Sequence, residues 1–299
     1  MIKTIFLGTS DAIPDANRSH TSILLIYEGE QILIDCGEGT QRQFRKAGLN
    51  PLKVTRILIS HWHGDHVLGI PGLLQTLAFS GYNKTLYIYG PKGTKKYIQE
   101  LIKSFVFVNK FSIKVEEVAN GKFLETKDFY IESRKMTHGP PCNAYSFVKK
   151  GNLKIDKKKL EKFKISEGVH LQKLKEGKNL TFNGKKYLAK NLTYRDNDKK
   201  ISFVLDTSYN KDILPFVKNS NILISEATFS KEDAEKAREH KHMTTEQAAE
   251  IAKKANAEKL ILTHLSQRYS KNPEKILSEA KKIFKNSHLA KDLEEFDLN

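Results

Sequence analysis

Cysteine and long apolar runs are both scarce in this sequence. Its 299 residues include only Cys36 and Cys142, which form no Cys-x-x-Cys pair. A disulfide framework is therefore excluded, and a reducing compartment is expected. No apolar run approaches the length of a membrane span, and a strand pattern begins at residue 2 without a signal peptide before it. These absences predict a soluble, cytoplasmic protein with no membrane partner.

An excess of basic residues makes the chain strongly basic. Lys and Arg number 51 against 35 Asp and Glu, which gives a formal net charge of +16. Such an excess favours a polyanionic partner, with nucleic acid ahead of an anionic membrane, although solubility alone also explains it. Apolar residues make up 39% of the chain, which is enough to build a folded core.

Histidine is concentrated at one point of the chain. The segment 60–66 reads Ser-His-Trp-His-Gly-Asp-His and directly follows the apolar run at 57–59, which is typical of a buried strand. His61 and His63 project to the same side of an extended segment, and Asp65 and His66 follow at once. One metal ion could not easily take all four side chains, whereas two adjacent ions could. Nitrogen and oxygen ligands without thiolate suit a hydrolytic zinc site. The alternative is a solvated, histidine-rich loop without a metal. It is the weaker interpretation, because four residues that can bind metal lie within six positions.

Three more predicted strands end beside a residue that can bind metal. The strand at 129–135 precedes His138, the strand at 201–205 precedes Asp206, and the strand at 260–263 precedes His264. Any one of these alone would be an ordinary polar loop residue. Together with the strand before His61, they predict one layered α/β domain with a site on one rim.

The remaining elements are predicted from apolar periodicity and turn residues. Further strands are expected at 2–7, 21–28, 31–35, 85–89, 114–118 and 221–225, and helices at 40–47, 70–80, 93–104, 232–239 and about 273–285. Thr244 or Thr245 is expected to begin another helix as its N-cap. Asp35, at a strand end, could orient the metal histidines or cap its own turn, and the sequence leaves both open.

Residues 149–200 differ from the rest of the chain. They contain 17 Lys and Arg against 6 Asp and Glu, so this stretch carries +11 of the net charge and little apolar material. A solvated surface excursion is the simpler interpretation. The concentration of charge favours a basic arm that binds phosphates away from the chemistry.

Several stretches together resemble the metallo-β-lactamase superfamily and, within it, the ribonuclease Z family of endonucleases that trim tRNA 3′ ends. They are Phe-Leu-Gly-Thr at 6–9, Asp-Cys-Gly-Glu-Gly-Thr-Gln at 35–41, the histidine motif, Leu-Asp-Thr at 205–207, Glu-Ala-Thr-Phe at 226–229, His-Met-Thr at 242–244 and Thr-His-Leu-Ser-Gln-Arg-Tyr at 263–269. The histidine motif identifies only the superfamily, and the last three stretches are more specific. The resemblance spans about residues 2–270.

The resemblance implies a single metallo-β-lactamase-type domain over 1–299. Its expected fold is a four-layer αββα sandwich, with a protruding basic tRNA-binding arm inserted at 150–193. It also implies two zinc ions per subunit, with manganese or iron as alternatives. By position, His61, His63 and His138 would hold one ion, Asp65, His66 and His264 the other, and Asp206 would bridge them.

The same resemblance assigns catalytic roles. A water or hydroxide between the ions would attack the phosphate, and Asp65 would accept its proton. His242, held by Glu226, would protonate the leaving 3′ oxygen, so that the tRNA keeps a 3′-hydroxyl and the trailer a 5′-phosphate. Alone, these two would be a surface histidine and a strand-end carboxylate. Arg268 would bind substrate, although it could instead form only a surface salt bridge. Lys173 and Lys175 of the arm are the other candidates for substrate binding.

The implied partners are precursor tRNA and a second copy of the chain, with the arm of one subunit serving the other subunit's site in a homodimer. Two rival functions remain open at this point. One is a broader phosphodiesterase, nuclease or thioester hydrolase of the same superfamily. The other is a catalytically inactive nucleic-acid-binding homologue, which would have no need of seven zinc-ligand residues.

Two stretches depart from the family pattern. Many members carry a Pro-x-Lys-x-Arg-Asn loop that helps to reject tRNA already ending in CCA, whereas residues 14–19 read Pro-Asp-Ala-Asn-Arg-Ser. We therefore expect rejection of CCA-bearing tRNA to be weakened or lost. Arms of this length often carry a Gly-Pro turn, whereas residues 166–169 read Ser-Glu-Gly-Val. The arm is thus expected to keep its charge but to differ in shape.

Overall fold

The computed structural model describes residues 1–108 and 110–299. The chain divides into two compact units. Unit 1 comprises Met1–Leu124, Ile131–Phe147 and Lys200–Asn299, and unit 2 comprises Glu125–Tyr130 and Val148–Lys199.

Unit 1 contains two large β-sheets. The strand order of the first sheet is β18 (Glu295–Leu298), β1 (Ile2–Gly8), β2 (Ser22–Tyr27), β3 (Glu30–Ile34), β4 (Arg56–Leu58), β5 (Leu86–Gly90) and β6 (Ile113–Glu117). The strand order of the second is β17 (Ser287–Leu289), β16 (Lys259–Thr263), β15 (Ile222–Glu226), β14 (Lys199–Val204), β9 (Cys142–Lys149), β8 (Phe129–Met136) and β7 (Gly121–Glu125).

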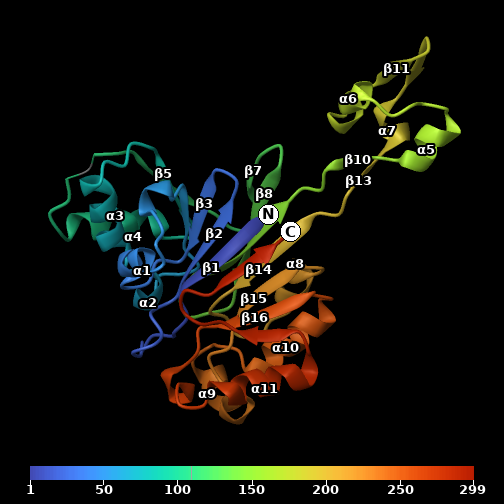
Figure 1. Cartoon of the computed structure of the whole chain (residues 1–299). Coiled ribbons are helices and arrows are strands. Elements are labelled where there is room, and N and C mark those ends of the chain that lie inside the picture. Colours follow the sequence, from blue (N-terminus) through green and yellow to red (C-terminus); the bar gives the residue numbers. More distant parts are fainter. Residues whose placement is uncertain (109) are drawn as a thin grey trace. The chain divides into compact units, whose positions relative to one another are not determined.

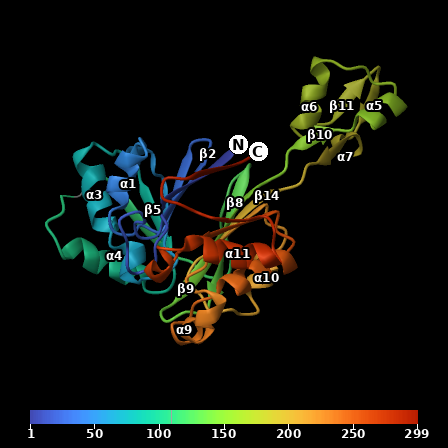
Figure 2. The same ribbon diagram turned by 60° about the horizontal axis from the view of Figure 1, so that its bottom comes forward.

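Helices cover the outer face of each sheet (Figures 1 and 2). Beside the first sheet lie α1 (Thr40–Lys46), α2 (Gly64–Val67), α3 (Ile70–Phe79) and α4 (Thr94–Lys103). Beside the second lie α8 (Ile213–Val217), α9 (Ala234–Glu239), α10 (Thr245–Lys254) and α11 (Pro273–Ile283). A separate apolar core joins each sheet to its helices. The predicted four-layer αββα sandwich is therefore confirmed for unit 1.

Each sheet contains a run of parallel strands, and this places the functional residues. Strands β3 to β6 are parallel in the first sheet, and β14 to β17 are parallel in the second. Because parallel strands run in the same direction, their carboxyl ends lie at the same edge of a sheet. The segments that follow β4, β8, β14 and β16 carry His61, His138, Asp206 and His264, so the prediction that these residues follow the ends of strands is confirmed.

Several strands lie outside the predicted elements. They are β7, β9, β17 and β18 in unit 1, together with all the elements of unit 2. β9 is buried along most of its length, and β18 pairs antiparallel with β1, so that both chain ends lie in one sheet. The predicted N-cap is confirmed at Thr244, which forms a capping box with Gln247.

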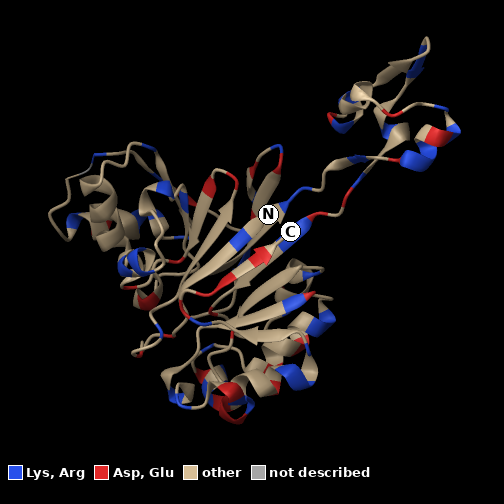
Figure 3. Cartoon of the chain, viewed as in Figure 1, with Lys and Arg blue, Asp and Glu red and all other residues tan. Residues whose placement is uncertain are grey.

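Unit 2 has a small core of its own. Its elements are β10 (Leu153–Ile155), α5 (Lys157–Lys162), α6 (Gln172–Lys175), β11 (Leu180–Phe182), β12 (Lys185–Tyr187), α7 (Ala189–Leu192) and β13 (Thr193–Arg195). Seven apolar side chains between Leu160 and Leu192 pack together. The apolar residues of this stretch are few, as expected, but they converge into a core that was not predicted from the sequence. Lys and Arg residues lie on its helices and strands (Figure 3).

Among the helices of residues 1–108 and 110–299, none combines the length and the apolar character that a membrane crossing requires.

Candidate metal centre and active site

The seven predicted ligands lie together in unit 1. They form two clusters that share Asp206: the first adds His61, His63 and His138, and the second adds Asp65, His66 and His264. Within each cluster one nitrogen or oxygen of every residue lies within 4.8 Å of the others. This division matches the two ligand sets that the family resemblance implies.

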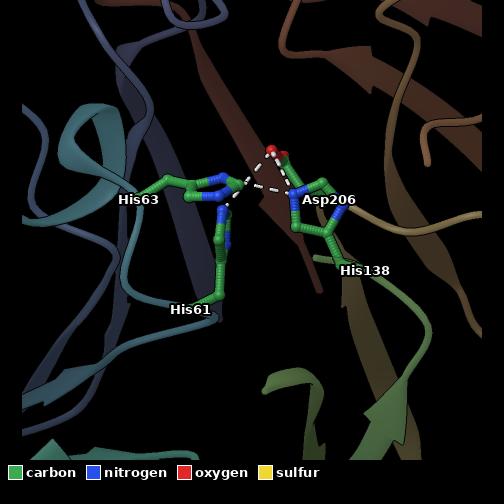
Figure 4. A group of neighbouring side chains, drawn as sticks. All are labelled: His61, His63, His138 and Asp206. Carbon is green, nitrogen blue, oxygen red and sulfur yellow. Dashed lines mark hydrogen bonds and ion pairs between the residues drawn. The ribbon is translucent and has the colours of Figure 1, made fainter. Parts of the chain in front are cut away.

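The first cluster is built from three histidines that face one carboxylate oxygen (Figure 4). Nε2 of His61 lies 3.6 Å from Oδ2 of Asp206, and Nε2 of His138 lies 3.9 Å from the same oxygen. Nε2 of His138 also lies 3.2 Å from Nδ1 of His63. These gaps leave room for a small cation within reach of all four groups.

The second cluster approaches both carboxylate oxygens of Asp206. Nε2 of His264 lies 3.2 Å from Oδ1 of Asp206 and 3.3 Å from Oδ2 of Asp65. Nε2 of His66 lies 3.4 Å from Oδ2 of Asp206 and 3.1 Å from Oδ2 of Asp65. The two Nε2 atoms are 3.3 Å apart. Each oxygen of Asp206 therefore faces imidazole nitrogen.

Hydrogen bonds behind the histidines determine which ring nitrogen carries the proton. Nδ1 of His66 lies 2.6 Å from Oδ2 of Asp35, and Nδ1 of His138 lies 3.0 Å from the carbonyl of Lys241. Both partners only accept, so each Nδ1 donates. The Ser60 hydroxyl donates to Asp35 and so accepts from Nδ1 of His61 at 3.0 Å. All three rings, when neutral, therefore direct an unprotonated Nε2 into the cluster.

These features fit a divalent metal ion. Within residues 1–108 and 110–299, Nε2 of His61 and Oδ1 of Asp206 are buried without a hydrogen-bond partner. Burial lowers the pKa of His61, His63 and His138, so these rings are neutral acceptors that face a carboxylate. Facing acceptors repel one another unless a cation lies between them, and imidazole with carboxylate is a donor set that suits zinc.

The second cluster calls for positive charge as well. Burial opposes protonation of His66, but Asp206, Asp65 and Asp35 outweigh it and raise the pKa of His66 well above its usual value. Burial alone would raise the pKa of Asp206, yet His264 and His66 hold that pKa well below its usual range. The carboxylates therefore remain ionised and available as metal ligands.

Two glycines bring the Asp35 turn against the histidine motif. The N–H of Cys36 donates to the carbonyl of His66 at 2.8 Å, and the N–H of Gly69 donates to the carbonyl of Cys36 at 2.9 Å. A Cβ on Gly37 would lie 2.5 Å from the Asp65 carbonyl oxygen, and one on Gly69 only 2.0 Å from that of Gly37. Only glycine permits this approach, which places Asp35 beside His66. Asp35 also accepts from the N–H of Ser60 at 2.7 Å. Its carboxylate therefore orients His66 and holds the backbone of the histidine motif at the same time.

His242 and Glu226 form a pair beside the metal clusters. Nδ1 of His242 lies 3.1 Å from both carboxylate oxygens of Glu226, which is fully buried, and Nε2 lies 4.0 Å from Asp206. Burial opposes protonation of His242, but the charges of Glu226 and Asp206 raise its pKa to about 9. Asp206 contributes less when it binds a cation, which leaves Glu226 as the main support of a protonated ring.

Three contributing groups were not predicted as site residues. They are Ser60 behind His61, the carbonyl of Lys241 behind His138, and Thr228, whose hydroxyl lies 2.8 Å from Nδ1 of His264. Thr228 stands in the Glu-Ala-Thr-Phe stretch, and Ser60 directly precedes the histidine motif, so both are adjacent to predicted positions. No sequence signal marks the Lys241 carbonyl.

An open cavity of about 920 Å³ leads to both clusters. His63, Asp65, His138, Asp206, His242 and His264 line its inner part. Arg268 also lines the cavity, with its guanidinium 5.0 Å from the centre of the Phe229 ring and 3.8 Å from Asp233. Arg268 is half-exposed, so it can reach an anionic ligand. Arg268 therefore both pairs with Asp233 and lines the cavity.

The two predicted substrate-binding lysines are in the other unit. Lys173 and Lys175 lie on α6 of unit 2, exposed on either side of Leu174, which is buried in that unit's core. The packing of Leu174 keeps both ammonium groups in solvent.

The loop at 14–19 uses its charged groups internally. Arg18 is buried and donates to the hydroxyl of Thr9 and the carbonyl of Ala290, both at 2.7 Å. Asp15 accepts from the N–H groups of Asn17 and Arg18. The loop therefore offers no exposed basic side chain to RNA.

Comparisons with known proteins relate the chain to a family. The family model described as anti-Pycsar protein Apyc1 matches residues 2–284. The ribonuclease Z of Nanoarchaeum equitans is 40% identical over 263 residues, covering 88% of this chain and 83% of that protein. The ribonuclease Z of Methanothermobacter thermautotrophicus is 38% identical over 294 residues, covering 98% and 95%.

Two solved structures are similar over 99% of this chain. Human tRNase Z, short form, is 25% identical with a TM-score of 0.72, and 99% of it is covered. The metallo-β-lactamase fold protein YhfI of Bacillus subtilis is 22% identical, also with a TM-score of 0.72, and 98% of it is covered. The second likeness concerns the fold alone.

The shared carboxylate gives the metal clusters a testable signature. His138→Ala is expected to weaken one divalent-ion site, His264→Ala the other, and Asp206→Ala both, because only Asp206 belongs to both clusters. Each loss should exceed the roughly 10- to 100-fold cost of losing an outer hydrogen bond. Zinc titration against a chromophoric chelator measures it. His288→Ala, which removes a histidine paired with Glu294, is the matched control. Full zinc binding by Asp206→Ala would contradict the assignment.

Proposed function

Because the chain belongs to the ribonuclease Z family of the metallo-β-lactamase superfamily, we propose that it is a zinc-dependent endoribonuclease that cuts precursor tRNA at its 3′ end. It removes the 3′ trailer and leaves a 3′-hydroxyl on the tRNA and a 5′-phosphate on the trailer. The observation that carries this proposal is the complete set of seven ligands with the His242–Glu226 pair at one open cavity. A reducing compartment, the cytoplasm, suits its two free and buried cysteines.

Two zinc ions per subunit fit the two clusters. His61, His63 and His138 would hold one ion and Asp65, His66 and His264 the other, with Asp206 shared. Bound there, zinc lowers the pKa of water toward neutrality and offsets the negative charge that builds up on the phosphate. The chain's own contribution is to hold the unprotonated ring nitrogens in place, since Asp35, Ser60 and Lys241 fix three of the imidazoles.

Asp65 is placed to accept a proton from attacking water. Its carboxylate reaches the cavity and is held at Oδ2 by His66 and His264. Although burial alone would raise the pKa of Asp65, those imidazoles keep it below its usual range, so the group is ionised. An ionised carboxylate at the cavity wall is available as a base.

His242 supplies the proton that the leaving oxygen needs. The 3′ oxygen of a ribose is a poor leaving group unless it is protonated, and general acids contribute about 10²- to 10⁴-fold to such steps. Nδ1 of His242 is held by Glu226, so Nε2 is the atom that faces the cavity and carries the transferable proton. Arg268, which lines the same cavity, is placed to bind a neighbouring phosphate through its planar guanidinium.

The basic arm, which we place at 150–193, binds the tRNA body. Lys173 and Lys175 are its candidate contacts, and the small core of unit 2 gives them a folded base. We propose a homodimer, as the family resemblance implies, in which one subunit's arm serves the other subunit's site. A broad phosphodiesterase acting on small substrates gains little from such an arm, and an inactive binding protein has no need of the ligand set.

Product mapping tests the function directly. Precursor tRNA incubated with the zinc-loaded chain is expected to yield a trailer with a 5′-phosphate and a tRNA with a 3′-hydroxyl. Terminal labelling and sequencing of both fragments identify the ends, with chelator-treated protein as the control. Cleavage of a small phosphodiester without any cleavage of precursor tRNA would favour the broader phosphodiesterase instead.

The role of His242 is tested by changing the leaving group. His242→Ala is expected to slow precursor tRNA cleavage by about 10²- to 10⁴-fold, because the 3′ oxygen then leaves unprotonated. Hydrolysis of bis(p-nitrophenyl) phosphate should fall much less, since nitrophenolate leaves without protonation. Single-turnover rates on both substrates measure the contrast. Equal losses on the two would argue against an acid at this position.

The arm is tested by deletion. Removing about residues 152–190 is expected to weaken tRNA binding while sparing hydrolysis of bis(p-nitrophenyl) phosphate. Each lost phosphate contact should also reduce the slope of log K against log salt by roughly 0.7 to 0.9. Mixing the deletion variant with His242→Ala should restore cleavage if arms act between subunits. Unchanged tRNA affinity would contradict an arm role.

The loop at 14–19 predicts weak discrimination at the tRNA end. Arg18 is buried and the family's lysine is absent, so precursors with an encoded CCA are expected to be cut nearly as well as those without it. Parallel cleavage assays on two precursors of the same tRNA, one with an encoded CCA and one without it, measure the ratio of the two cleavage rates. Strong rejection of the CCA form would refute this expectation.

A further inference from the structure

The Thr228 hydroxyl lies between the metal clusters and the His242–Glu226 pair. Its Oγ1 is 2.8 Å from Nδ1 of His264, 2.6 Å from Oε2 of Glu226 and 3.4 Å from Nδ1 of His242. The residue is 3% exposed, so water does not substitute for these contacts. One hydroxyl therefore contacts a metal-cluster histidine and the acid pair at the same time.

A hydroxyl has one proton, and its neighbours determine where that proton points. Glu226 already accepts from the N–H of Thr207 at 2.8 Å and from Nδ1 of His242, so it is a carboxylate that only accepts. The Thr228 proton must then lie toward Glu226. Toward His264 the hydroxyl oxygen can only accept, which requires a proton on Nδ1 of that ring.

This arrangement has consequences at both ends. With Nδ1 protonated, a neutral His264 ring presents an unprotonated Nε2 to Asp65 and Asp206, as a metal ligand must. At the other end, Glu226 is held by three donors, which fixes the carboxylate that orients His242. Without the hydroxyl, His264 is free to move its proton to Nε2, and Glu226 loses its shortest contact.

We propose that Thr228 is a positioning residue whose single hydroxyl proton links the metal ligand His264 to the acid pair Glu226 and His242. The metal part of this inference stands on the cluster geometry alone, and the acid part rests on the proposed function. Neither the order of residues in the sequence nor the ligand set itself requires His264 and the Glu226–His242 pair to contact the same hydroxyl.

Isosteric substitution separates the hydroxyl from the packing. Thr228→Val keeps the volume and removes the hydroxyl, whereas Thr228→Ser keeps the hydroxyl. Thr263→Val is the matched control, because Thr263 is also buried at the end of a strand, next to His264, yet its hydroxyl has no hydrogen-bond partner among the described residues. Circular dichroism and thermal melting show that each variant is folded.

Zinc affinity and leaving-group dependence are then compared. Thr228→Val is expected to bind one of two zinc equivalents about 10- to 100-fold more weakly. At saturating zinc it should lose more activity on precursor tRNA than on bis(p-nitrophenyl) phosphate. Thr228→Ser and Thr263→Val should match the unsubstituted chain in both measurements.

Two results would overturn the inference. One is a Thr228→Val chain with unchanged zinc affinity and equal losses on both substrates. The other is a Thr228→Ser chain as impaired as Thr228→Val, which would show that packing matters rather than the hydroxyl. If the unsubstituted chain cuts no precursor tRNA, the proposed function fails, but the zinc titrations still test the link between Thr228 and His264.

Discussion

Asp206 is the carboxylate on which the site depends, because imidazole nitrogens face both of its oxygens. Four histidines approach it within 3.2 to 3.9 Å, and it is almost fully buried. Three of those rings, held from behind by Asp35, Ser60 and Lys241, direct unprotonated nitrogen toward it when neutral. Lone pairs packed so closely in a buried position are unfavourable unless positive charge lies among them. The fold therefore holds these groups so close together that bound cations are needed to offset their mutual repulsion.

The sandwich supplies the energy that keeps these groups together. Parallel strands in both sheets end at the site, and each sheet is joined to its helices by a dense apolar core. Non-glycine residues with left-handed backbone occur at Asp35, Lys241 and His264, where φ is 56°, 57° and 56°. Such conformations cost free energy and persist where the surrounding packing fixes them. In each case the turn directs a side chain or a carbonyl to the metal clusters.

The ligands were predictable from the sequence because each follows a strand whose apolar pattern is local. The groups behind them were not, since a bond such as that between His138 and the Lys241 carbonyl joins positions 103 residues apart. β18 was missed although its residues Glu-Phe-Asp-Leu alternate polar and apolar, because four residues are too short a pattern to predict a strand without the pairing with β1. The core of unit 2 was hidden because its apolar residues are spread singly among lysines and meet only through several short elements. Local pattern thus identifies the atoms of the chemistry, and long-range contact determines their protonation and orientation.

The most direct measurement is anomalous X-ray scattering from crystals grown with zinc. The account predicts two peaks, one on each side of Asp206, each about 2.0 to 2.2 Å from the nitrogen and oxygen atoms of its cluster. It also predicts that Nδ1 of His66 and of His138 remain within hydrogen-bond distance of Asp35 and of the Lys241 carbonyl. The absence of both peaks, or zinc bound elsewhere with these imidazoles turned away from Asp206, would contradict it.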